Sequence, residues 1–75
     1  MSKLYFSDGY NLFDLEINQE EKKLIKNKKP FQKNDQIPTE DGLVDATWVF
    51  NPSEDTVYIY CEDGAEFISH NYFLD

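Results

Sequence analysis

The sequence contains no arginine, and no lysine follows Lys33. Fifteen acidic residues outnumber seven lysines, for a net charge of −8. Residues 34–75 contain ten acidic side chains and no Lys or Arg, whereas residues 19–33 contain six lysines and two glutamates. Nucleic-acid binding needs basic side chains that neutralise phosphates, so the composition argues against direct nucleic-acid binding. It favours a basic protein surface as the partner.

Cysteine is almost absent, and long apolar runs are missing altogether. The single cysteine, Cys61, excludes an internal disulfide and fits a reducing compartment. The first eight residues lack the basic start and apolar run of a signal peptide. No stretch approaches the ~20 apolar residues that a membrane span needs. We therefore expect a soluble cytoplasmic protein with no membrane partner, in the host-cell cytoplasm if it is encoded by a phage. Residues 1–75 are expected to form one small domain.

The stretch from Thr56 to Phe67 has the clearest pattern in the chain. Its first half alternates apolar residues with tyrosines, as in a strand with two unlike faces. A three-residue loop ending at Gly64 sets Cys61 opposite Ala65, whereas a two-residue loop would set it opposite Glu66. We adopt the three-residue loop because it gives one consistent apolar face. That face comprises Val57, Ile59, Cys61, Ala65 and Phe67, and the mixed face comprises Tyr58, Tyr60, Glu66, Ile68 and His70.

The first part of the chain predicts a hairpin followed by a helix. Strands at residues 3–6 and 10–17, joined by a two-residue Asp8-Gly9 loop, would pair Leu4 with Phe13 and Lys3 with Asp14. Phe13, Leu15 and Ile17 would then face the core. Asn18 and Glu21 form a capping-box pattern, which predicts a helix from Gln19 to about Asn27 or Lys29.

Residues 32–42 are mostly polar and contain Pro38 and Gly42, which both disfavour helices and strands, so we predict an exposed connection. A third strand follows at residues 43–50, with Val44, Ala46, Trp48 and Phe50 on one face and Asp45 and Thr47 on the other. The apolar end, residues 68–75, is expected to dock on the domain. The predicted fold class is α+β, a small antiparallel sheet or half-barrel in the order ββαβββ with one helix packed against it.

Catalytic and metal sites are not favoured. Cys61 lies on the predicted core face and His70 on the other face at the far end of the hairpin, so the two do not form a nucleophile–base pair. The acidic residues lack the regular alternation of a calcium loop. We therefore predict no enzyme activity, no catalytic residue, no metal and no cofactor.

Exposed tyrosines among carboxylates are typical of contact surfaces, because tyrosine buries a large area at small entropic cost. A meander would also bring the start of the third strand and the turn at residues 62–64 to the same end of the sheet. The candidate partner-binding residues are therefore Glu40, Asp41, Asp45, Tyr58, Tyr60, Glu62, Asp63 and Glu66.

The expected function is that of a small inhibitor whose carboxylates occupy positions that phosphates fill on a nucleic-acid-binding enzyme. Size and charge are analogous to those of anti-CRISPR and anti-restriction proteins, which suggests a phage or mobile element that counters host defence. An immunity protein or antitoxin that neutralises a basic toxin is the alternative, and its electrostatics are the same. A small phage structural subunit is a further alternative. Acidic residues that serve only for solubility are the plainest explanation. The sequence leaves monomer and dimer open.

Overall fold

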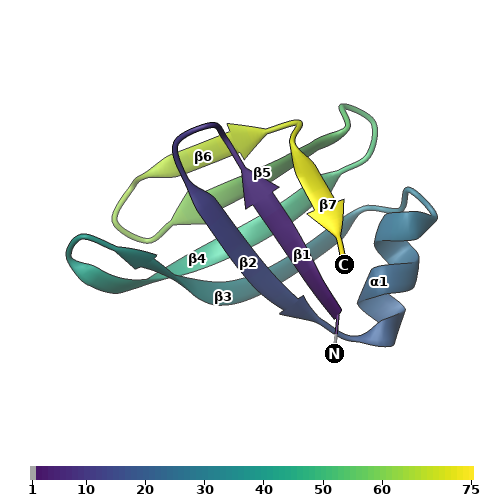
Figure 1. Ribbon diagram of the computed structural model, residues 1–75, viewed down its shortest axis with the longest axis horizontal. Coiled ribbons are helices and arrows are strands. Elements are labelled where there is room, and N and C mark those ends of the chain that lie inside the picture. The colour runs from purple at the N-terminus through teal and green to yellow at the C-terminus, as the bar shows by residue number, and fades with distance from the viewer. Residues whose placement is uncertain (1) are drawn as a thin grey trace.

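The computed structural model describes residues 2–75, which form two antiparallel sheets and one helix (Figure 1). The three-stranded sheet has the order β2-β1-β7, and the four-stranded sheet has the order β3-β4-β5-β6. The elements are β1 (Ser2–Ser7), β2 (Leu12–Ile17), α1 (Gln19–Lys26), β3 (Phe31–Thr39), β4 (Gly42–Asn51), β5 (Thr56–Cys61), β6 (Glu66–Ser69) and β7 (Tyr72–Leu74).

The predicted α+β class is confirmed in its coarse form, but the order ββαβββ is wrong because the chain contains two further strands. The segment predicted as an exposed connection is β3, which pairs with β4 along its whole length. Phe31 and Ile37 are buried and lie on one face of it, although the residues between them are polar. Pro38 is tolerated because β3 is an edge strand, where a missing N–H removes no ladder hydrogen bond.

The second additional strand, β7, is formed by the apolar chain end, which docks as expected. It pairs antiparallel with β1, and Asp75 continues the contact by donating its N–H to the Lys3 carbonyl at 3.2 Å. The Lys3 N–H donates in turn to the Asp75 carboxylate at 2.7 Å, and the start of β1 consequently lies beside the end of β7 (Figure 1).

The hairpin of β5 and β6 has the predicted register. Ile59 lies opposite Phe67, and the Cys61 N–H donates to the Ala65 carbonyl at 2.8 Å. Gly64 closes the loop with a positive φ of 95°. The predicted faces are confirmed except at Ala65, which is exposed because it belongs to the turn rather than to the strand.

The β1–β2 hairpin has a longer loop than predicted, so its register differs by two residues. Leu4 lies opposite Leu15 and Phe6 opposite Phe13. The Asp8 carboxylate favours the longer loop by accepting the N–H groups of Tyr10 at 2.9 Å and Asn11 at 2.6 Å. A shift by two keeps every side chain on its face, so the predicted burial of Phe13, Leu15 and Ile17 is confirmed. Lys3 and Asp14 still form an ion pair at 3.5 Å, but diagonally.

Helix α1 begins as predicted and ends before Pro30. The Asn18 side chain accepts the Glu21 N–H, and the Glu21 carboxylate accepts the Asn18 N–H, each at 2.8 Å. The helix ends at Lys26, and Ile25 is its buried residue. A helix this short with one buried side chain depends on its cap and on its contact with the sheets for stability.

The core lies between the two sheets, which face each other through aromatic side chains. Phe6 packs edge-on against Trp48 at 6.3 Å between ring centroids, and Phe13 against Phe67 at 5.2 Å. The predicted inward residues of the third strand are confirmed, since Ala46, Trp48 and Phe50 are buried and Val44 packs against the core. The opposite face of the four-stranded sheet therefore points away from the core. No helix among residues 2–75 is long and apolar enough to cross a membrane.

Candidate functional site

The face of the four-stranded sheet that points away from the core carries most of the predicted contact residues. We call it the outer sheet face. Tyr60 and Ile68 on it are 42% and 53% exposed, so no other element of the described chain covers them. Its residues include Asn34, Gln36, Asp45, Thr47, Val49, Tyr58, Tyr60, Glu62, Glu66 and Ile68.

Strand register arranges these side chains in rows across the sheet. Tyr58 lies between Val49 on β4 and Ile68 on β6, which makes an apolar row across three strands. Tyr60 lies in the next row, directly opposite Glu66. An apolar centre beside charged groups is the usual composition of a protein–protein contact surface.

The two tyrosines are held in a fixed arrangement. Their rings stack with centroids 5.9 Å apart and planes only 2° apart. The Tyr58 hydroxyl donates to the Glu54 carboxylate, and this hydrogen bond raises the pKa of Tyr58 above its usual range. The hydrogen bond to Glu54 thus holds Tyr58 to the β4–β5 turn, and the Tyr58 ring packs against the Tyr60 ring. Little side-chain entropy remains to be lost when a partner covers them.

The carboxylates of the outer sheet face are not neutralised by neighbouring cations. The three ion pairs within residues 2–75 involve Asp14, Asp55 and Glu21, none of which belongs to this face. Lys33, the lysine of β3, points to the opposite side, where its Nζ donates to the Glu16 carbonyl at 2.9 Å. Asp45, Glu62 and Glu66 therefore make the face acidic.

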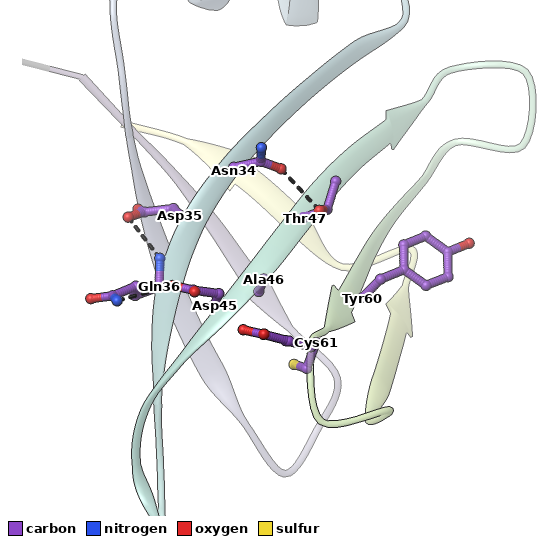
Figure 2. A pocket seen from close by; sticks show the side chains of 9 residues that line it. Asn34, Asp35, Gln36, Asp45, Ala46, Thr47, Tyr60 and Cys61 are labelled. Carbon is purple, nitrogen blue, oxygen red and sulfur yellow. Dashed lines mark hydrogen bonds between the residues drawn. The ribbon is translucent and has the colours of Figure 1, made fainter.

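A hollow of about 690 Å³ lies beside Tyr60, across β3, β4 and the end of β5 (Figure 2). Gln36 Nε2 donates to Asp45 Oδ1 at 3.0 Å, and the Thr47 hydroxyl donates to Asn34 Oδ1 at 2.9 Å. Figure 2 shows Tyr60 projecting away from Gln36 and Asp45, so the polar hollow and the aromatic surface lie next to each other. Amide and carboxylate oxygens in the hollow offer acceptors for cationic donors.

The predicted site residues are brought together only in part. Asp45, Tyr58, Tyr60, Glu62 and Glu66 share the outer sheet face. Asp63 lies in the β5–β6 turn, where its Oδ1 accepts the Ala65 N–H at 2.9 Å, and it lines a second hollow with Asp45 and Glu62.

Glu40 and Asp41 do not join that group. They form the turn between β3 and β4, and Asp41 lies four residues from Asp45, about 13 Å along an extended strand. The β3–β4 turn is at the predicted end of the sheet but farther out (Figure 1). No group of three or more His, Cys, Asp or Glu side chains among residues 2–75 is arranged to hold a metal ion.

Cys61 and His70 are far from a catalytic arrangement. Cys61 is 8% exposed on the core side at one end of β5, and burial raises the pKa of its thiol. His70 Nδ1 lies 3.3 Å from the Asp55 carbonyl at the other end of that strand. The two side chains therefore have separate surroundings.

Some contributors to the outer sheet face were not identified from the sequence. Asn34 and Gln36 lie in the segment predicted as an exposed connection, and Glu54 is not among the predicted contact residues. Phe31 and Ile37 are six residues apart and would share one face of a strand, and this spacing is the signal that would have indicated a strand there.

No protein-family model, curated protein or solved structure matches this chain.

Proposed function

We propose that the chain is a non-catalytic inhibitor whose outer sheet face covers a basic, nucleic-acid-binding surface of another protein. The observation that carries this proposal is the joint placement of the stacked tyrosines and the uncompensated carboxylates Asp45, Glu62 and Glu66 on one uncovered face. The carboxylates take the positions of phosphates, and the tyrosines form the desolvated centre of the contact.

The size of the face suits such a contact. The molecule measures 35 by 25 Å across its two longer axes. A standard protein–protein interface, which buries roughly 800 Å² per partner, would take up most of that outline. Two copies meeting through this face would bring unneutralised carboxylates together, so a basic partner fits it better than a second copy.

The test is capture of host-cell proteins on the immobilised chain, followed by competition with duplex DNA and with RNA. We expect a captured nucleic-acid-binding protein that an excess of nucleic acid displaces, because both ligands occupy one surface. A partner that stays bound under excess nucleic acid would contradict the proposed mechanism.

Variants of the outer sheet face locate the contact. Tyr58→Ala and Tyr60→Ala should each speed dissociation and cost about 1–3 kcal/mol of binding free energy if the side chain is a hot spot. Glu20→Gln, on the exposed side of α1, is the matched surface control. Thermal melts serve as the folding control, and equal capture by the Tyr60→Ala protein would exclude this face.

A further inference from the structure

The two sheets meet at two junctions, and the junction between β2 and β3 is an open seam. At one junction, where the chain passes from β6 to β7, the Ser69 hydroxyl of β6 donates to the Ser7 carbonyl of β1 and connects the two sheets. At the other junction β2 and β3 belong to different sheets. The contact of Lys33 Nζ with the Glu16 carbonyl at 2.9 Å bridges one end of this seam.

The backbone of β2 has free hydrogen-bonding groups on the seam side. The Asp8 N–H donates to the Asn11 carbonyl. The backbone groups of every second residue after Asn11, including Phe13 and Leu15, therefore bond to β1. Leu12, Asp14 and Glu16 have the other parity, and their N–H and C=O groups point into the seam. The Lys33 contact with the Glu16 carbonyl agrees with this assignment. Leu12 and Asp14 present an unpaired strand edge.

The facing edge of β3 is protected against pairing. The Glu62 N–H donates to the Asp45 carbonyl, so Asp45 bonds toward β5, and the alternate residues of β4 bond toward β3. The backbone groups of Gln36 and the carbonyl of Pro38 consequently point into the seam. The Gln36 N–H donates to the Asp35 carboxylate at 2.8 Å, and Pro38 has no N–H. Proline and side-chain caps are common devices that keep an edge strand unpaired.

A hollow of about 190 Å³ lies along the exposed half of the β2 edge. It is lined by Tyr5, Leu12, Phe13, Asp14 and Pro38. Leu12 is 66% exposed there. The free backbone groups therefore stand beside open, largely apolar space.

We propose that the β2 edge at Leu12–Asp14 accepts an extended segment of a partner protein as an additional strand, with basic residues on that segment. Strand addition satisfies the free N–H and C=O groups, and alternate side chains of the added strand supply specificity. Asp14 and Glu16 point outward from β2. Lys3 lies opposite Glu16 and forms its ion pair diagonally with Asp14, so this one cation leaves one negative charge for a basic cross-strand neighbour.

Charge decides between the possible occupants. A second copy of this chain, with a net charge of −8, would bring acids against Asp14 and Glu16. A basic segment gains at the same positions, and its intervening apolar residues point to the other face, beside Phe13. This site lies on the three-stranded sheet, so it does not depend on the function proposed for the outer sheet face.

The test uses a short peptide of alternating lysine and valine, with blocked ends, and amide hydrogen exchange followed by NMR. At saturating peptide, exchange of the Leu12 and Asp14 N–H groups should slow about tenfold or more, because a hydrogen-bonded amide exchanges only when the bond opens. The Tyr58 and Tyr60 amides should keep their rates. The control peptide has the same sequence and charge but N-methyl groups at alternate positions, and it should bind about tenfold more weakly.

Two protein variants separate strand addition from general attraction of a cation. Asp14→Lys should weaken binding of the peptide, whereas Glu20→Lys, with the same change in net charge on α1, should have little effect. Equal binding of the methylated peptide, no binding of either peptide, or protection confined to Tyr58 and Tyr60 would each overturn the proposal. Self-association of the chain through Leu12 in sedimentation would also overturn it, in favour of a second copy.

Discussion

Tyr72 joins three distant segments at one point. Its hydroxyl donates to the Asp55 carboxylate, and Lys28 Nζ lies 3.4 Å from that hydroxyl and 3.5 Å from the carboxylate. The Tyr72 ring packs edge-on against Phe50 with centroids 5.2 Å apart. Lys28 and Asp55 have positive φ angles of 57° and 54°, a conformation that non-glycine residues rarely adopt. The cluster holds β7 to the β4–β5 turn and to the segment after α1.

Protonation of Asp55 should weaken this cluster. The hydrogen bond from Tyr72 and the charge of Lys28 hold the pKa of Asp55 below its usual value. A carboxyl group whose pKa is lower in the folded state stabilises the protein above its unfolded pKa, and this contribution is lost as the pH falls through the folded pKa. We therefore expect thermal stability to fall below about pH 4 partly through Asp55.

The Asp55→Asn variant tests that expectation, since asparagine also tolerates a positive φ. Its melting temperature should be lower than that of the original protein at neutral pH, and the difference should narrow as the pH falls toward the folded pKa of Asp55. Glu20→Gln is the control for loss of a surface charge. A constant difference between the two proteins at all pH values would contradict a role for the Asp55 charge.

Cys61 gives a second prediction at this scale. It is 8% exposed on the core face, and burial together with the charge of Asp63 raises the pKa of its thiol. Alkylation at neutral pH should therefore be slow in the folded protein and fast in denaturant. Cys61→Ala should cost on the order of 1 kcal/mol of stability and leave partner binding intact. Loss of binding in a folded Cys61→Ala protein would show that the side chain belongs to the contact.

At the scale of the elements, α1 is stabilised at its first turn. Asn18 and Glu21 satisfy each other's backbone N–H groups, and one side chain of the helix, Ile25, is buried. Asn18→Ala should cost about 1 kcal/mol, because an N-cap substitution leaves helix N–H groups without an acceptor. Chemical denaturation measures the loss. Gln19→Ala is the matched control, and an equal effect of both substitutions would argue against the cap.

The strand β3 shows how an element can be set by its neighbour. Seven of its nine residues are polar or proline, so its own pattern is weak. Its partner β4 is strongly patterned, and the short turn at Glu40 and Asp41 brings the preceding residues beside it in register. The propensity of a strand is largely a property of the surface it packs on. Pairing with β4 therefore overrides the polar composition of the segment.

The whole molecule has a charge polarity along its length. The α1 region, with six lysines in residues 19–33, lies at one end, and the β3–β4 and β5–β6 turns with Glu40, Asp41, Glu62 and Asp63 lie at the other (Figure 1). The long axis is 35 Å, several times the Debye length of about 8 Å at physiological ionic strength. The two ends therefore act on a partner as separate fields of opposite sign.

The association rate constant with a basic partner should be high at low salt and should fall as ionic strength rises. Surface-plasmon kinetics on the captured partner measure both rate constants. Removing the four charges at the turns, with Glu40→Gln, Asp41→Asn, Glu62→Gln and Asp63→Asn, should slow association more than it speeds dissociation, because exposed charges mainly steer the encounter. Affinity that stays flat from low to high salt would contradict phosphate mimicry.

Local chemistry in the sequence determined the parts of the structure that depend on neighbouring residues. The capping box at Asn18 and the loop ending at Gly64 appear as predicted, and so do the two faces of β5. Each depends on a few residues whose hydrogen bonds or φ angles are decided within one turn. Tyr58, Tyr60 and Glu66 are therefore predicted on one face of this hairpin from the sequence alone.

Tertiary structure decided which distant segments pair. The strands β3 and β7 and the separation of Glu40 from Glu62 follow from packing of the two sheets around Trp48 and Phe6. The open seam between β2 and β3 has the same origin. Pairing partners depend on the shape and burial of surfaces far away in the chain, and no local pattern records them.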